Sequence, residues 1–118
     1  MKPRILLLYK RSTYEELEPF SPSQKKERQR FFRSHKRHYA TLKRVELFLK
    51  QEHVPFTKIY RGGRIPFNYF DIVMTVGGDG TFLEAAHAVK NQIIFGVNSD
   101  PQWSVGRFCA ANPDNFPI

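Results

Sequence analysis

The sequence lacks the residues and runs that several protein classes need. Its single cysteine, Cys109, cannot form an internal disulfide, and no group of cysteine and histidine residues has the spacing of a structural zinc site. No apolar run approaches the ~20 residues of a membrane-spanning helix, and the run at residues 5–9 is too short for a signal-peptide core. These absences argue against a disulfide scaffold, a membrane span and secretion, and we expect a cytoplasmic protein.

Acidic residues are scarce in one segment, which therefore carries the whole net charge of +8. Between Lys25 and Lys50 there are ten lysines and arginines but only two glutamates, whereas charges balance in the remaining residues. A concentrated positive field suits an anionic partner, such as a nucleotide, a nucleic acid, a membrane surface or an acidic protein face. The alternative interpretation is the solvated face of a basic helix.

Four short runs have the length and composition of β-strands. Residues 5–9, 71–76 and 93–97 are apolar almost throughout, as in central strands that are covered on both faces. Residues 56–60 alternate between apolar and polar, as in a strand near a sheet edge. We therefore expect the three apolar strands to be adjacent and central in one parallel sheet.

Two segments predict helices. Ser21-Pro22-Ser23-Gln24 has the pattern of a capped helix start, from which a long helix should run to about His53. Residues 82–89 predict a second helix, with Asn91 as its stop. The long helix carries a stripe of ring-bearing and aliphatic residues that we expect to face the core, namely Phe31, Phe32, His35, Tyr39, Leu42, Val45, Phe48 and Leu49.

The order of these elements predicts the fold class. The 118 residues are 41% hydrophobic and 14% aromatic, which is enough apolar material for one compact core and a single domain. Strands that alternate with helices favour parallel pairing through right-handed crossovers. We therefore predict an α/β fold, specifically a Rossmann-like three-layer domain with a largely parallel sheet.

The segment Gly77-Gly78-Asp79-Gly80-Thr81 connects a predicted strand to a predicted helix. Ligands of open α/β sheets bind at such turns, and glycines let backbone N–H groups approach phosphate oxygens. The segment is not a P-loop, because no Gly-Lys-Ser/Thr follows. Asp79 would repel a phosphate, so it either faces a hydroxyl group or holds a magnesium ion. The alternative is that Asp79 merely caps the helix.

Two motifs in this chain resemble those of a known family. Val76 to Ala86 resembles the GGDGT signature of NAD kinases, which diacylglycerol and sphingosine kinases share. Gly96-Val97-Asn98-Ser99-Asp100-Pro101, followed by Ser104, Gly106 and Cys109, is similar to a segment of the mitochondrial-type branch of NAD kinases. The stretch with Lys10, Thr13, Tyr14 and Glu15, and the helix around residues 35–49, also resemble that branch, so the resemblance covers nearly the whole chain.

The resemblance implies roles for particular residues. Asp79 matches the catalytic aspartate that faces the adenosine ribose 2′-hydroxyl of NAD and acts as its base. Arg107 stands where NAD kinases have an aromatic residue that helps to bind adenine, and a guanidinium can stack on a base or pair with phosphate. The remaining candidates for nucleotide binding are Gly77, Gly78, Gly80 and Thr81 in the phosphate loop, and Asn98, Ser99 and Asp100 in the second turn.

The same resemblance implies an ATP-dependent, magnesium-requiring enzyme that converts NAD to NADP. NAD and ATP would be its partners, it would form a homo-oligomer, and nucleic acid would not be a partner. NAD kinases also have a β-rich carboxyl-terminal domain and an Asn-Glu/Asp motif, which these 118 residues do not contain. We therefore expect residues 1–118 to be an amino-terminal nucleotide-binding domain that is inactive alone. The alternatives are a lipid or sugar kinase that shares GGDGT, and a non-catalytic module whose basic helix binds a polyanion.

Four further residues have an ordinary structural interpretation beside a functional one. His87 is expected to be a surface or packed side chain of the second helix, although it could approach the site. Trp103 and Phe108 would either stack on a base or pack against neighbouring residues. Cys109 is expected to be a small buried hydrophobe, because no histidine and asparagine accompany it in the pattern of a cysteine nucleophile.

Overall fold

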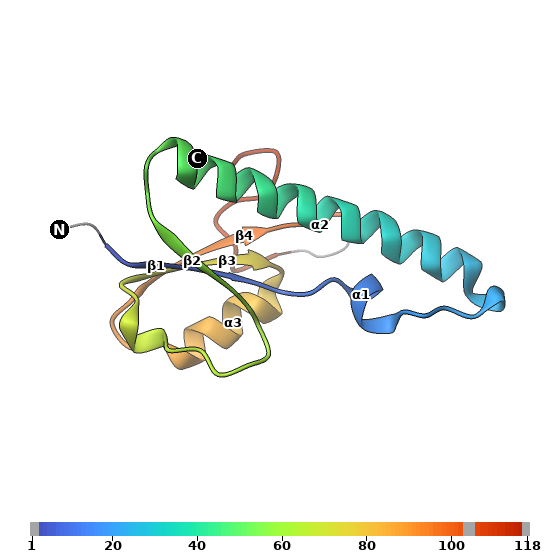
Figure 1. The fold of residues 1–118 in the computed structure, drawn as a ribbon, viewed down its shortest axis with the longest axis horizontal. Coiled ribbons are helices and arrows are strands. Elements are labelled where there is room, and N and C mark those ends of the chain that lie inside the picture. The colour runs from blue at the N-terminus through green and yellow to red at the C-terminus, as the bar shows by residue number, and fades with distance from the viewer. Residues whose placement is uncertain (1–2, 103–105, 117–118) are drawn as a thin grey trace.

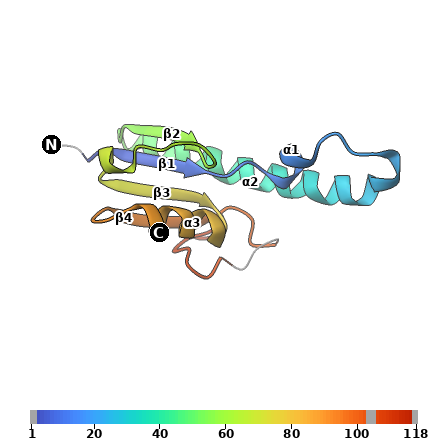
Figure 2. The ribbon, with the colours of Figure 1, turned by 90° about the horizontal axis from the view of Figure 1, so that it is seen from below.

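A computed structural model of the chain describes residues 3–102 and 106–116. Its sheet contains four strands, β1 (Ile5–Tyr9), β2 (Phe56–Tyr60), β3 (Ile72–Gly77) and β4 (Ile93–Asn98). All neighbouring strands pair in parallel, in the order β2-β1-β3-β4 (Figure 2). The predicted α/β fold with a parallel sheet is therefore confirmed.

The position of β4 differs from the prediction. The three apolar strands are adjacent as expected, but β4 is the outer strand of the sheet and only β1 and β3 are central. Ile93, at the start of β4, is 65% exposed, whereas Val97 is fully buried. The buried end of β4 is covered by the chain that follows it, since Val97 makes a parallel bridge to Ala111. The apolar residues at the end of β4 are thus buried by the segment around Ala111, which follows β4 in the chain.

Helices cover both faces of the sheet and give three layers (Figures 1 and 2). The long helix α2 (Lys25–Gln51) packs on one face through a core that includes Leu7, Leu42 and Val45. The helix α3 (Asp79–Ala88) lies on the other face, where Ala85 packs with strand residues that include Leu6 and Val73. Consecutive residues of β1 thus enter opposite cores, as expected for a central strand.

A short helix, α1 (Thr13–Leu17), was not predicted, although its signal is present in the sequence. Ser12 and Glu15 form a capping box, in which the Ser12 hydroxyl accepts from the Glu15 N–H and the Glu15 carboxylate accepts from the Ser12 N–H. The predicted capping box of Ser21 and Gln24 is present, but it opens a 3₁₀ turn, Pro22–Gln24, that precedes α2. A second 3₁₀ turn spans Phe67–Tyr69.

The predicted apolar stripe of α2 divides into two halves with different partners. Its carboxyl-terminal half faces the sheet core as expected, with Leu42, Val45 and Leu49 buried. The amino-terminal half of α2 extends beyond the sheet (Figure 1) and therefore cannot reach that core. There the stripe residues pack with the α1 segment in an aromatic cluster of Tyr14, Phe20, Phe31, Phe32, His35 and Tyr39.

The helix α2 ends at Gln51, close to the predicted end at about His53. His53 adopts a left-handed conformation with φ of 55°. The N–H groups of His53 and Val54 donate to the carbonyls of Lys50 and Leu49, which closes the last turn. Among the described helices, α2 included, none combines the length and apolar character that crossing a membrane would require.

Candidate functional site

The carboxyl ends of the four parallel strands bring the predicted site segments together. Gly77 at the end of β3 is the register partner of Asn98 at the end of β4. The Ser99 N–H donates to the Gly77 carbonyl at 2.9 Å, which joins the two turns directly. The prediction that both turns open on one edge of the sheet is therefore confirmed.

The GGDGT segment begins α3 three residues earlier than the sequence suggested. Gly78 is the N-cap and Asp79 is the first helical residue, so the Asp79 carboxylate lies at the positive end of the helix. Its two oxygens accept hydrogen bonds from the backbone N–H groups of Arg107 at 2.9 Å and Phe108 at 2.8 Å. Asp79 thus ties the 106–108 segment to the start of α3, while the Arg107 side chain remains exposed.

Two glycines at this edge allow contacts that a side chain would block. A Cβ at Gly77 would lie 2.6 Å from Thr81 Oγ1 and 3.2 Å from Lys10 Cγ. Gly106 has φ of +65°, and a Cβ there would lie 2.3 Å from Asn98 Nδ2. The absence of side chains at these two positions therefore lets the loop segments approach Thr81 and Asn98 closely.

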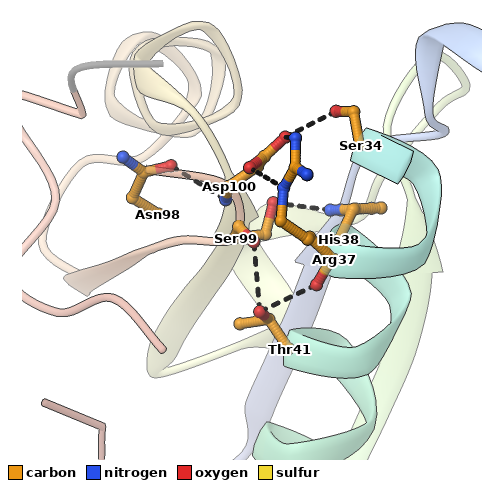
Figure 3. A network of polar contacts seen from close by, with 7 residues as sticks. All are labelled: Ser34, Arg37, His38, Thr41, Asn98, Ser99 and Asp100. Carbon is orange, nitrogen blue, oxygen red and sulfur yellow. Dashed lines mark hydrogen bonds and ion pairs between the residues drawn. The ribbon is translucent and has the colours of Figure 1, made fainter. Parts of the chain in front are cut away.

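The second turn is attached to α2 through a polar network (Figure 3). Arg37 pairs with the buried Asp100 carboxylate in a two-point contact, with its Nε 2.6 Å from Oδ1 and its second contact to Oδ2 at 3.2 Å. The Ser34 hydroxyl donates to Oδ2 at 2.6 Å. Thr41 Oγ1 lies 3.1 Å from the Ser99 carbonyl. The side chain of Asp100 is therefore occupied by α2.

His38 is the centre of this network and is buried. Its Nε2 lies 2.7 Å from the Lys10 carbonyl, which only accepts, so Nε2 carries the proton and Nδ1 accepts from the Ser99 hydroxyl at 2.6 Å. Burial lowers the pKa of His38 to about 4, although the bond to the Lys10 carbonyl partly opposes this effect. His38 is thus neutral at physiological pH and links β1, α2 and the Asn98–Asp100 turn.

Of the three residues predicted in that turn, Asn98 lies differently from the other two. Its Oδ1 accepts from the Asp100 N–H at 3.2 Å, and its amide nitrogen points away from α2 toward the Gly106 side (Figure 3). Ser99 and Asp100 direct their side chains into the α2 network instead. Thr81, predicted in the phosphate loop, is also buried, and its hydroxyl lies 3.4 Å from the Arg61 guanidinium.

Sequence reasoning missed two cations that the fold brings to the same edge. Lys10 follows β1, packs its Cγ against Gly77 and is half-buried, and burial lowers the pKa of its ammonium. Arg61 follows β2, and its guanidinium lies over Gly80 and pairs with Glu84 at 3.5 Å. The signal was available, because each residue directly follows a predicted strand of a parallel sheet.

The four residues with alternative interpretations are placed as follows. His87 is exposed in the last turn of α3, and Phe108 stacks on Phe82 with the ring centroids 6.0 Å apart. Cys109 is half-buried, and burial raises the pKa of its thiol to about 11, with the Asp79 charge as a smaller cause. Trp103, like Ser104 of the second motif, lies outside the described residues.

The family resemblance implies an enzyme that requires magnesium. Residues 3–102 and 106–116 contain no group of three or more histidine, cysteine, aspartate or glutamate side chains that could hold a metal. The described side chains therefore do not fit a protein-built magnesium site.

Comparison with known proteins gives three informative similarities. The chain is 39% identical to the NADH kinase of Arabidopsis thaliana, in a match that covers 43% of this chain and 21% of the relative. It is 31% identical to the probable NADH kinase of Oryza sativa subsp. japonica over 67% of the chain and 30% of the relative. A shorter match, 49% identical, covers 30% of the chain and 14% of the NAD kinase of Thermosipho melanesiensis.

These similarities support a relationship between this chain and the NAD kinase family. No family model matches the chain. The chain spans less than a third of the length of each of these three relatives. The similarities therefore concern only a part of the length of each relative.

Proposed function

We propose that this chain supplies the nucleotide-facing part of an ATP-dependent NAD kinase. The reaction transfers the γ-phosphoryl group of ATP to the adenosine ribose 2′-hydroxyl of NAD and yields NADP. The observation that carries the proposal is the position of Asp79 at the start of α3, two residues after Gly77, which is the register partner of Asn98 on the carboxyl edge of the sheet. The resemblance of GGDGT and of the Asn98 turn to the mitochondrial-type NAD kinases supports the same assignment, as do the names of the similar proteins.

Asp79 acts as the general base in this proposal. The hydroxyl oxygen forms a bond to the γ-phosphorus while the bond from that phosphorus to the bridging oxygen of ATP breaks, and the hydroxyl proton moves to Asp79. An ionised carboxylate has about four lone-pair sites, so the two backbone bonds from residues 107 and 108 leave capacity for the ribose hydroxyl. These bonds also fix the orientation of the carboxylate, which favours proton transfer along one direction.

The remaining candidates contribute through binding and positioning. Gly78 and Gly80 present backbone near the start of α3, where helix N–H groups favour phosphate. Asn98 directs its amide nitrogen away from α2 (Figure 3), and in this proposal that nitrogen donates to the nucleotide. Ser99 and Asp100 hold this turn in place through α2, and the exposed Arg107 stacks on the base or pairs with phosphate. Nucleotide contact by Ser99, Asp100 or Thr81 stays a prediction.

The activity assay uses the longest natural protein that contains this sequence. NAD and NADH are supplied separately as acceptors, since two similar proteins are named NADH kinases, and diacylglycerol and sphingosine serve as control acceptors. We expect ATP-dependent phosphorylation of a dinucleotide and none of either lipid. Phosphorylation of a lipid without any dinucleotide product would instead establish a lipid kinase. Binding of nucleic acid or anionic vesicles without any kinase activity would favour the polyanion-binding alternative.

A further inference from the structure

A cationic cavity lies on the β1 and β2 side of the GGDGT turn. Its volume is about 480 Å³, and Lys10, Arg11, Arg61, Glu16 and Glu84 supply its charged lining. Lys10 and Arg61 follow the carboxyl ends of β1 and β2, the two strands that lie beyond β3 on the side away from β4. The cavity therefore adjoins the predicted phosphate loop from the side opposite Asn98.

The Lys10 ammonium is a half-buried positive charge in this cavity, near Glu16 and Asp100 but without a salt bridge. Among the described residues, no carboxylate lies within ion-pair distance of it, and no acceptor hydrogen-bonds to it. The side chain is half-buried between its own strand and Gly77. A desolvated ammonium without a partner is costly, so a bound anion would compensate it.

Arg61 is held in place as the second cation. Its backbone N–H donates to the Tyr9 carbonyl at 2.7 Å, and its guanidinium spans Gly80, Thr81 and Glu84. Glu84 balances one positive charge, and Glu16 lines the same cavity, so the three cations exceed the two carboxylates by one. The amino terminus of α3 adds further positive potential beside Gly80.

We propose that Lys10 and Arg61 bind the triphosphate group of the phosphoryl donor. The binding of a polyphosphate follows from the cavity itself, whereas its assignment to the donor rests on the proposed function. In-line phosphoryl transfer requires the acceptor and the leaving group to lie on opposite sides of the transferred group. With the acceptor ribose at Asp79 and Asn98, the donor phosphates approach from the side of Lys10 and Arg61.

The test measures binding of inorganic tripolyphosphate, ATP and NAD to the 118-residue chain by isothermal titration calorimetry. The variants are Lys10→Met and Arg61→Met, and the matched control is Arg64→Met, which removes the same charge from an exposed position outside the cavity lining. Each of the first two should weaken binding of tripolyphosphate and ATP by about tenfold or more, because a charged hydrogen bond to phosphate is lost. Arg64→Met should change binding by less than about twofold, and NAD binding should be similar in all variants.

Each result has a definite meaning. An equal loss of tripolyphosphate binding in Arg64→Met would overturn the proposal, since the general positive field would then account for binding. An equal loss of NAD binding in Lys10→Met and Arg61→Met would overturn the assignment to the donor. Binding of tripolyphosphate that depends on Lys10 and Arg61, in a protein that forms no NADP, would support the polyphosphate site and contradict the proposed function. Far-UV circular dichroism checks that each variant is folded. If Lys10→Met unfolds, Arg61→Met still tests the proposal, because Arg61 is only half-buried.

Discussion

The protonation of His38 makes the stability of this protein depend on pH in a calculable way. The ordinary pKa of histidine is about 6.5, and burial lowers that of His38 to about 4 in the folded chain. Above pH ~7 the imidazole is neutral in both the folded and the unfolded chain, so its titration does not change the free energy of unfolding. As the pH falls from about 6.5 to about 4, the unfolded chain binds a proton that the folded chain does not, so stability decreases over this window.

The size of this decrease follows from the shift. Each pKa unit corresponds to about 1.4 kcal/mol, so lowering the pKa of His38 from about 6.5 to about 4 decreases the free energy of unfolding at low pH by about 3 kcal/mol. Urea unfolding at a series of pH values, followed by circular dichroism, measures this quantity. The variant His38→Gln should be less stable at pH 7, because it cannot keep both hydrogen bonds, and should lose this part of the pH dependence.

The matched control is His87→Gln, which changes an exposed histidine of α3. This variant should keep the pH dependence of the unaltered chain, since it leaves His38 and its two hydrogen bonds in place. Equal stability of the unaltered chain at pH 7 and pH 4.5 would refute this role of His38. Retention of the full decrease in His38→Gln would also refute it, because another group would then be responsible.

Three further predictions concern the turns at the carboxyl edge. Gly77→Ala places a Cβ 2.6 Å from Thr81 Oγ1 and should lower the free energy of unfolding, measured by chemical denaturation, by about 1–3 kcal/mol. Unchanged stability would contradict this prediction and show that the loop adapts to the added methyl group. Asp100→Asn leaves Arg37 without its carboxylate and should lower the free energy of unfolding by about 2–3 kcal/mol. A double-mutant cycle with Arg37→Met should show that the two substitutions are coupled, and additive effects would argue against the ion pair. Cys109, whose thiol pKa burial raises to about 11, should react with iodoacetamide at pH 8 far more slowly in the folded than in the urea-unfolded chain, and equal rates would contradict its burial.

The strands and the shared edge of the two turns could be predicted because their signals are local. An apolar run of five or six residues indicates a buried strand, and parallel strands necessarily place their carboxyl ends together. The capping box of Ser12 and Glu15 was equally local, so α1 could have been predicted as well.

The polar face of α2 could not be predicted from hydrophobic patterning. Ser34, His38 and Thr41 are buried, yet each is polar and each contacts the Ser99–Asp100 segment, which lies about sixty residues later in the chain. The apolar stripe predicted a core along the whole helix, but the sheet is shorter than α2. The hydrogen-bond partners of these residues depend on the tertiary structure, and the spacing of apolar residues along a helix does not predict them.

The conversion of Asp79 to asparagine tests the central claim most directly, in the longest natural protein that contains this sequence. Asparagine keeps the size of the side chain and can still accept a backbone hydrogen bond, but it is a far weaker base. Steady-state formation of NADP from NAD and ATP should show kcat lowered by roughly 10²- to 10⁴-fold, with KM for both nucleotides within about threefold. An unchanged kcat would contradict the account, because Asp79 would then only hold the 106–108 segment against the start of α3.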